Sequence, residues 1–282
     1  MKKYGILITI LLILGLGTGL FLLNKTPSKN VVTVSTKATN QVPTLYVHGY
    51  GGSANSTNAM IAAAEKSDKA QKVLTAIVSS TGDVTYSGDW QESVKNPIIQ
   101  VVFKRSNAQI PEEGEWIGKI VTHLQKSYKI KAVNIVAHSM GGSSAVYWAE
   151  SVRKESDPKL NNFVPIAVPI NGVLGMNEEA NKNVLLKNGE PKSKSENYQS
   201  YYENRKKFPS NTNVFVIYGD IDDGSNSDTA VSIVSARSMS YLLKDQVKSY
   251  KELKITGENA QHSKLHSNDK VDQAVIQFLW GK

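Results

Sequence analysis

From residue 41 onward, short runs dense in valine and isoleucine alternate with longer stretches of helical periodicity. The runs that we expect to form strands are Thr44–His48, Ile98–Lys104, Ala132–Ala137, Phe163–Val168, Asn213–Tyr218 and Ser249–Ile255. Strands this uniformly apolar are covered on both faces. The expected helices are Glu115–Tyr128, Met140–Lys154, Val231–Leu243 and Asp269–Trp280. This alternation predicts one α/β domain over residues 41–282, with a mainly parallel central sheet flanked by helices.

Two polar stretches interrupt the alternation. Asp83–Lys95 is typical of a small polar hairpin or excursion. Residues 172–212 are rich in Asn, Lys, Glu and Ser, and they join two strands where about 2–6 residues would suffice. We expect this longer stretch to be either a lid over an active site or a solvated insertion.

The amino-terminal segment carries a different signal. Lys2 and Lys3 precede an uncharged run from Gly5 to Leu23, which is long enough to span a bilayer as a helix. We therefore predict that residues 1–23 are a signal-anchor, with a polar linker over residues 24–40. The flanking lysines favour a cytoplasmic amino terminus, which places the domain outside the cell at the membrane. A cleavable signal peptide is the alternative, and the protein would then be secreted.

Composition removes several classes of function. The sequence contains no cysteine, which excludes a thiol nucleophile and a thiolate metal site. Its formal net charge is +8, but the lysines are scattered and form no dense basic stripe interleaved with aromatic residues. We therefore predict no nucleic-acid partner and interpret the charge as a solvated basic surface or an attraction to anionic lipid headgroups.

The densest chemical signal is the stretch from Ala137 to Gly142, which reads AHSMGG. It directly follows one expected strand and directly precedes an expected helix. Small residues two positions before and after Ser139 allow a sharp turn, which exposes the hydroxyl at a helix amino terminus. The pattern predicts Ser139 as the nucleophile of an acyl-transfer enzyme.

A second glycine-rich turn ends the first expected strand, where residues 48–52 read HGYGG. Glycines let backbone N–H groups approach a ligand without obstruction. The spacing matches neither a phosphate-binding P-loop nor a dinucleotide-binding fingerprint. We expect the backbone N–H groups of Tyr50 and Met140 to form an oxyanion hole.

Together these two motifs resemble the bacterial lipase and esterase branch of the α/β hydrolases. More closely, residues 41–282 resemble the Gram-positive cell-surface hydrolase family called domain of unknown function 915. The resemblance implies an α/β-hydrolase fold, a Ser–acid–His order along the chain and ester hydrolysis.

Activation of Ser139 requires a general base. His48 and His138 belong to the two motifs, and His123 falls in an expected helix, which leaves His262 and His266 after the last strand. In similar lipases the catalytic histidine precedes a leucine by three residues and a core valine by about nine. Leu265 and Val271 match that spacing for His262, so we prefer His262, with His266 as the alternative.

The base in turn needs an acid, and the loop after Asn213–Tyr218 offers several aspartates. Many members of the class use an aspartate in a G-x-x-D turn, which would be Asp222. Lipase-like members use one three residues before a valine, which would be Asp228, although Thr229 stands where their pattern has glycine. We prefer Asp228, with Asp222 as the alternative. The acidic spacing is not that of an EF-hand, and calcium binding is a minor alternative.

The sequence thus predicts a membrane-anchored extracellular serine hydrolase that cleaves carboxylic esters with Ser139, His262 and Asp228. It needs no metal or organic cofactor, and its partners would be a small-molecule or lipid ester and the membrane. The sequence gives no indication of oligomeric state. Two alternatives remain: a catalytically silent surface binding module, and an amidase or thioesterase with the same three residues.

Overall fold

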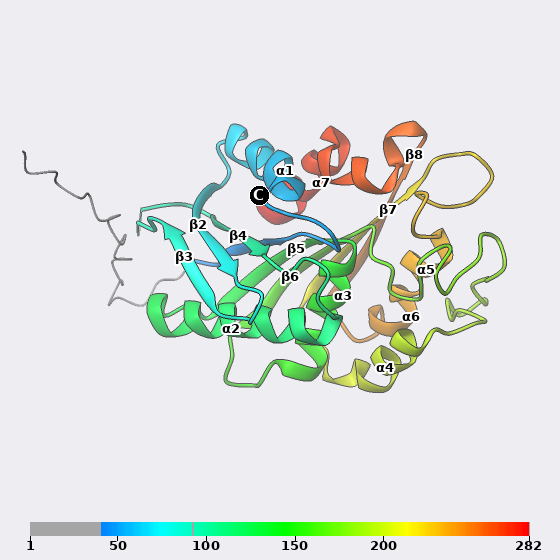
Figure 1. The fold of residues 1–282 in the computed structure, drawn as a ribbon, viewed down its shortest axis with the longest axis horizontal. Coiled ribbons are helices and arrows are strands. Elements are labelled where there is room, and N and C mark those ends of the chain that lie inside the picture. The colour runs from blue at the N-terminus through cyan, green and yellow to red at the C-terminus, as the bar shows by residue number, and fades with distance from the viewer. Residues whose placement is uncertain (1–40, 92, 282) are drawn as a thin grey trace, which may run out of the picture. The chain divides into compact units, whose positions relative to one another are not determined.

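A single sheet organises the computed structural model, which describes residues 41–91 and 93–281. Its order is β3-β2-β4-β1-β5-β6-β7-β8 (Figure 1). The strands are β1 (Thr44–Val47), β2 (Gln71–Val78), β3 (Val84–Gly88), β4 (Pro97–Phe103), β5 (Ala132–His138), β6 (Lys159–Ile166), β7 (Asn213–Asp220) and β8 (Ser249–Thr256). Only β3 is antiparallel to its neighbour. We call the edge where the parallel strands begin the amino edge, and the edge where they end the carboxyl edge.

Helices cover both faces of this sheet (Figure 1). They are α1 (Asn55–Lys66), α2 (Ile110–Tyr128), α3 (Met140–Tyr147), α4 (Glu196–Asn204), α5 (Ile233–Arg237), α6 (Met239–Leu243) and α7 (Asp269–Trp280). α1 and α7 lie on one face over an apolar cluster that includes Tyr46 and Val136. α2 to α6 lie on the other face over a larger cluster around Trp116 and Trp148. Burial of apolar side chains on both faces stabilises the sheet.

The structure confirms the predicted α/β class and the mainly parallel sheet. All six predicted strands are present with small shifts of their ends, and α7 has the predicted bounds. The stretch Asp83–Lys95 contains one strand, β3, and so forms only half of the predicted hairpin. The other strand of the hairpin is β2, which the sequence analysis did not predict. Helix α1 was missed as well.

Three helix predictions were wrong in detail. The helix predicted to begin at Glu115 is α2, which begins at Ile110. Val231–Leu243 is not one helix but α5 and α6, separated at Ser238. The Ser238 hydroxyl donates to the Val234 carbonyl (2.7 Å), and such a local bond competes with regular helix. Met140–Lys154 is α-helical only to Tyr147 and continues as a π-helical turn, Trp148–Val152.

The predicted signal-anchor (1–23) and linker (24–40) lie outside the described residues. None of the helices in the described part of the chain is long and apolar enough to cross a membrane.

Candidate active site

Ser139 lies in a strained turn between β5 and α3. Its φ is 54° and its ψ is −132°, a backbone conformation that L-residues seldom adopt. Close backbone approach explains the glycines around it. A Cβ on Gly141 would lie 2.3 Å from the His48 carbonyl oxygen, and one on Gly49 would lie 2.7 Å from the Ser139 Cβ. The two glycine motifs of the sequence therefore meet at this serine.

This contact gives a first prediction. Gly141→Ala forces the first turn of α3 away from His48, so we expect a loss of about 3 kcal/mol in the free energy of unfolding. Gly175→Ala is the control, because Gly175 has φ +78 with open space around it and its alanine costs about 1 kcal/mol. Chemical denaturation of both variants measures the difference. Equal losses would contradict the proposed crowding at the turn.

Three side chains from different elements form a hydrogen-bonded chain. Ser139 Oγ lies 2.9 Å from Nε2 of His262, and Nδ1 of His262 lies 2.9 Å from Oδ2 of Asp228. Asp228 is 1% exposed, and the His262 N–H donates to its backbone carbonyl at 2.7 Å. Bond partners assign the tautomer: Nδ1–H donates to the carboxylate, which leaves Nε2 free to accept the serine proton.

The loop after β7 holds the Asp228 carboxylate in place. Oδ1 accepts the backbone N–H groups of Ala230 (2.9 Å) and Val231 (2.7 Å), while Oδ2 faces His262. Asp222, the alternative acid, is exposed and has φ 60°, and its N–H donates to Asp220 Oδ1 (3.1 Å). The structure therefore brings Asp228, and not Asp222, to His262.

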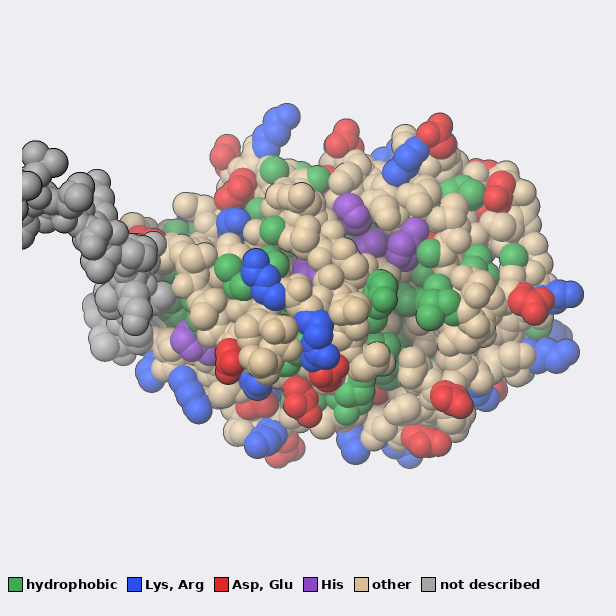
Figure 2. Space-filling view, in the orientation of Figure 1, with side chains coloured by type: hydrophobic (Ala, Val, Ile, Leu, Met, Phe, Trp, Pro, Cys, Tyr) green, Lys and Arg blue, Asp and Glu red, His purple; other side chains and the backbone are tan. Residues whose placement is uncertain are grey.

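The His138 ring adjoins two others, those of His262 (ring centroids 4.8 Å) and His266 (4.9 Å), and histidine side chains gather near the middle of the face shown in Figure 2. The buried His138 ring lies between them, and its Nε2–H donates to the His262 carbonyl (2.9 Å). Burial, followed by the charges of His262 and His266, holds the pKa of His138 well below its ordinary value. A neutral His138 fixes the His262 backbone without adding a charge. The His266 ring lies nearly perpendicular to the His138 ring (ring centroids 4.9 Å), its Nδ1 lies 3.4 Å from Ser267 Oγ, and it makes no hydrogen bond with Ser139.

Met140 directly follows Ser139, and Tyr50 directly follows Gly49, whose Cβ, if present, would lie 2.7 Å from the Ser139 Cβ. Within the described chain, the N–H groups of Tyr50 and Met140 donate to no other residue. The turn that presents Tyr50 is closed by Gly52 N–H donating to the Gly49 carbonyl (3.1 Å). His48 supports this turn from below, since its Nδ1–H donates to the Gly49 carbonyl (2.9 Å) and its Nε2 accepts the Phe103 N–H (3.0 Å). Free donors beside a nucleophile can stabilise a developing oxyanion.

Comparison with protein families matches residues 32–282 to a family described as α/β hydrolases of unknown function, domain of unknown function 915. The chain belongs to this family. The resemblance inferred from the two glycine motifs is thereby confirmed.

Solved structures support the fold of this family member. The product of the gene lin2722 of Listeria innocua has 24% identity and a TM-score of 0.78, over 85% of this chain and 94% of that one. A candidate cell surface hydrolase of Lactobacillus plantarum WCFS1 has 23% identity and a TM-score of 0.69, over 86% and 91%. At these identities the likeness establishes the fold alone. A comparison with proteins of curated function found no match.

Residues of the polar stretch 172–212 form hydrogen bonds with the loop that carries Asp228. The sequence analysis did not predict these contacts. The Ser232 hydroxyl donates to Glu178 Oε1 (2.6 Å), and the Leu174 N–H donates to the Ala230 carbonyl (2.9 Å). Asn181 exchanges two further bonds with this loop. No local pattern marks such pairs, because the partners lie about fifty residues apart in sequence.

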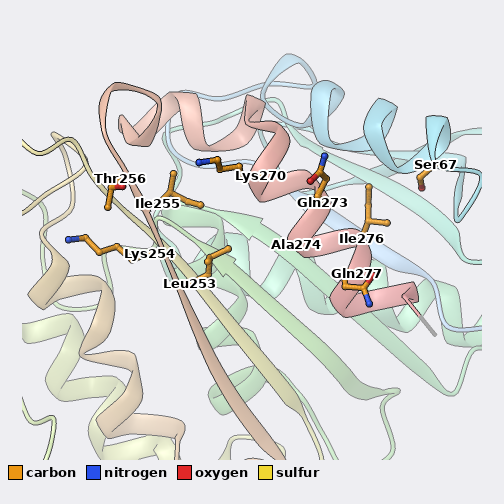
Figure 3. A pocket seen from close by; sticks show the side chains of 10 residues that line it. All are labelled: Ser67, Leu253, Lys254, Ile255, Thr256, Lys270, Gln273, Ala274, Ile276 and Gln277. Atoms are coloured by element: carbon orange, nitrogen blue, oxygen red, sulfur yellow. The ribbon is translucent and has the colours of Figure 1, made fainter.

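A cavity of about 830 Å³ lies between β8 and α7, lined by residues such as Leu253, Lys254 and Gln277 (Figure 3). None of its lining residues belongs to the Ser139–His262–Asp228 chain, so we assign it no part in that chemistry. Within the described residues, no group of three His, Asp or Glu side chains is arranged to hold a metal ion.

A buried carboxyl ties the serine's helix to α2. Ser144 Oγ donates to Glu113 Oε2 (2.7 Å), and burial raises the pKa of Glu113 to about 8. The folded state thus binds this proton more tightly than the unfolded state does. The resulting stability is complete below the ordinary value of 4.5 and is lost as pH rises through about 8.

Glu113→Gln removes this titration. We expect the free energy of unfolding of the variant, measured by urea denaturation, to exceed that of the native protein by an amount that grows from pH 5 to pH 9. The growth should be on the order of 3 kcal/mol. Glu115→Gln, at an exposed position of the same helix, should show no such growth. A difference independent of pH would contradict the assignment.

Proposed function

We propose that this protein is a membrane-anchored extracellular serine hydrolase that cleaves carboxylic esters. One observation carries the proposal: Ser139 Oγ and Asp228 Oδ2 each lie 2.9 Å from opposite nitrogens of the His262 ring. This geometry suits a serine nucleophile, its general base and the carboxylate that orients the base. The roles of Tyr50 and Met140 as oxyanion donors rest on their free N–H groups.

The proposed reaction has two acyl-transfer steps. His262 Nε2 takes the Ser139 proton as Oγ attacks the ester carbonyl carbon, and the oxyanion accepts the N–H groups of Tyr50 and Met140. The intermediate collapses, the C–O bond of the ester breaks, and the leaving alcohol takes the proton from His262. His262 then takes a proton from water as the water oxygen attacks the acyl carbon. The bond from that carbon to Ser139 Oγ breaks, the carboxylic acid leaves, and His262 returns the proton to Oγ. Asp228 stabilises the imidazolium that forms in each step.

A fluorophosphonate probe and a chain-length series of nitrophenyl esters test this proposal. We expect the native protein to be labelled at Ser139 and to hydrolyse at least one ester, and Ser139→Ala to do neither. Thermal unfolding of the variant serves as the control for folding. A folded native protein that neither labels nor turns over any ester would refute the proposal and favour a silent binding module.

The same groups attack any acyl carbon, so amides and thioesters are the second candidate substrates. Matched nitrophenyl ester, anilide and thioester substrates of one acyl group separate the three by their kcat/KM. We propose esters ahead of amides because an alkoxide is a better leaving group than an amide anion; thioesters stay a second candidate.

The proposed location rests on sequence. The uncharged run Gly5–Leu23 supports a membrane anchor with the domain outside the cell, or secretion if the segment is cleaved. The similar Lactobacillus plantarum protein is named as a hydrolase of the cell surface. We therefore propose a small-molecule or lipid ester as substrate and the membrane as the second partner.

A further inference from the structure

Cationic side chains gather at the amino edge of three neighbouring strands. The segments that lead into β5, β6 and β7 are residues 129–131, 153–159 and 205–212. They carry eight cationic residues, which we call the amino-edge cluster: Lys129, Lys131, Arg153, Lys154, Lys159, Arg205, Lys206 and Lys207. The same segments hold only two carboxylates, Glu155 and Asp157.

The carboxyl edge of the same strands has the opposite balance. Ser139 directly follows β5, and residues 167–195 and 221–232 follow β6 and β7. These segments carry four lysines (Lys182, Lys187, Lys192 and Lys194) and six carboxylates (Glu178, Glu179, Glu190, Asp222, Asp223 and Asp228). The positive charge is therefore concentrated at the edge opposite the candidate active site.

The amino-edge cluster is one surface and not a scatter of charges. β5, β6 and β7 are consecutive in the sheet, and the Lys159 N–H donates to the Lys131 carbonyl (2.9 Å). Burial raises the pKa of Glu150, just before Arg153, and the charges of Arg205 and Lys207 oppose that rise. The segments before β6 and β7 therefore lie within electrostatic reach of each other. The cluster spans only three adjacent strands, and sheet twist rotates these strands only modestly relative to one another. Their amino ends can therefore contact one flat surface together.

The charges of the cluster are not held in ion pairs within the described part of the chain. Within residues 41–91 and 93–281, none of the eight forms an ion pair with a carboxylate, whereas five ion pairs between a lysine or arginine and a carboxylate occur elsewhere. All six lysines of the cluster are exposed. Contacts such as Lys207 Nζ to Asn204 Oδ1 (2.8 Å) are with neutral groups. Like charges at this density repel one another, so an anionic surface would stabilise them.

The chain enters the domain beside this cluster. The Asn134 N–H donates to the Pro43 carbonyl (2.8 Å), which places residues 41–43 at the amino edge next to β5 and Lys131. Seventeen residues separate the uncharged run ending at Leu23 from Gln41 and span at most about 60 Å. A bilayer that holds the run would therefore lie within reach of the cluster.

We propose that the amino-edge cluster docks on an anionic lipid bilayer, which turns Ser139 away from the membrane. Each lysine near such a surface favours the docked state roughly fivefold, and salt screens the effect. The docking does not depend on the proposed catalysis and should persist in Ser139→Ala. If the proposed hydrolase activity holds, the substrate reaches Ser139 from the aqueous side and not from the bilayer plane.

Orientation can be measured in the full chain, because a protein without cysteine accepts a single label site. Ser156→Cys places a fluorophore at the amino edge, and Met176→Cys, at an 83% exposed position, places one at the carboxyl edge. Both are reconstituted into vesicles containing a headgroup quencher, with either zwitterionic or partly phosphatidylglycerol lipid. On anionic vesicles we expect severalfold stronger quenching at position 156 than at 176, and loss of this difference at high salt.

Charge variants make the test specific. Neutralising Lys154, Lys159, Lys206 and Lys207 to glutamine should abolish the difference in quenching. The matched control removes the same charge from Lys104, Lys182, Lys187 and Lys192, which are exposed and at the carboxyl-edge end of the sheet, and should leave the difference intact. Thermal unfolding checks that both variants are folded.

Three outcomes would overturn the proposal: equal quenching at the two positions, stronger quenching at 176, or the same effect from both sets of glutamines. A fourth is protection of the cluster lysines from acetylation by soluble polyphosphate without any protection on anionic vesicles. That result would assign the cluster to an anionic polymer in place of the membrane.

Discussion

His262→Ala is expected to lower kcat for a nitrophenyl ester by about 10⁶, whereas His266→Ala is expected to leave it within a few-fold of the native value. Only His262 has Nε2 within 2.9 Å of Ser139 Oγ and Nδ1 against a carboxylate. Without it, no group accepts the serine proton. The His266 ring packs nearly perpendicular to the His138 ring, and burial, the largest cause, lowers the pKa of His266. Removing the His266 side chain therefore removes a packing contact with His138, but the proposed reaction has no step that uses His266.

Steady-state kinetics with the preferred ester measures both variants, with thermal unfolding as the control for structure. In the proposed mechanism Ser139 and His262 act as a unit, so Ser139→Ala and the double variant should each cost about as much as His262→Ala alone. Losses that add in free energy would mean that the two residues act separately. A large loss in His266→Ala with a small one in His262→Ala would reverse the assignment.

The sequence predicted the fold well because the decisive information is local. Runs rich in valine and isoleucine mark strands buried on both faces, and the glycines around Ser139 mark the turn that only small residues permit. Gly141 illustrates this, since its missing Cβ is what lets His48 approach. One helix prediction was wrong where the apolar periodicity continued through a residue that ends a helix in the structure. Ser238 separates α5 from α6 although the apolar periodicity continues past it, and its hydroxyl donates to the Val234 carbonyl.

The sequence favoured Asp228 but left Asp222 open as the acid, for a physical reason. Asp222 and Asp228 lie in the same acidic loop, and both match patterns used by the class. The two aspartates differ in the path of the backbone around them. Asp228 is buried and its Oδ1 accepts two backbone N–H groups, whereas Asp222 is exposed. That path depends on contacts with the distant insertion, including the bond from Ser232 to Glu178. A pattern of residues within one loop carries no record of those partners.

Asp228→Asn is expected to lower kcat by about 10⁴ while leaving the fold intact. The asparagine oxygen can still accept the N–H groups of Ala230 and Val231, so the loop keeps its shape. Its amide group, however, presents N–H donors to His262 Nδ1. The imidazole then carries its proton on Nε2, where it can no longer accept the proton of Ser139.

Asp222→Asn is the matched control. It changes the same atoms in the same loop, and asparagine tolerates the φ of 60° at this position. We expect its kcat to stay within a few-fold of the native value. Steady-state kinetics and urea denaturation of the two variants measure activity and stability separately. If Asp222→Asn lost activity as strongly as Asp228→Asn, the acidic loop would act through its total charge. The hydrogen bond from His262 to Asp228 would then not be the basis of the reaction.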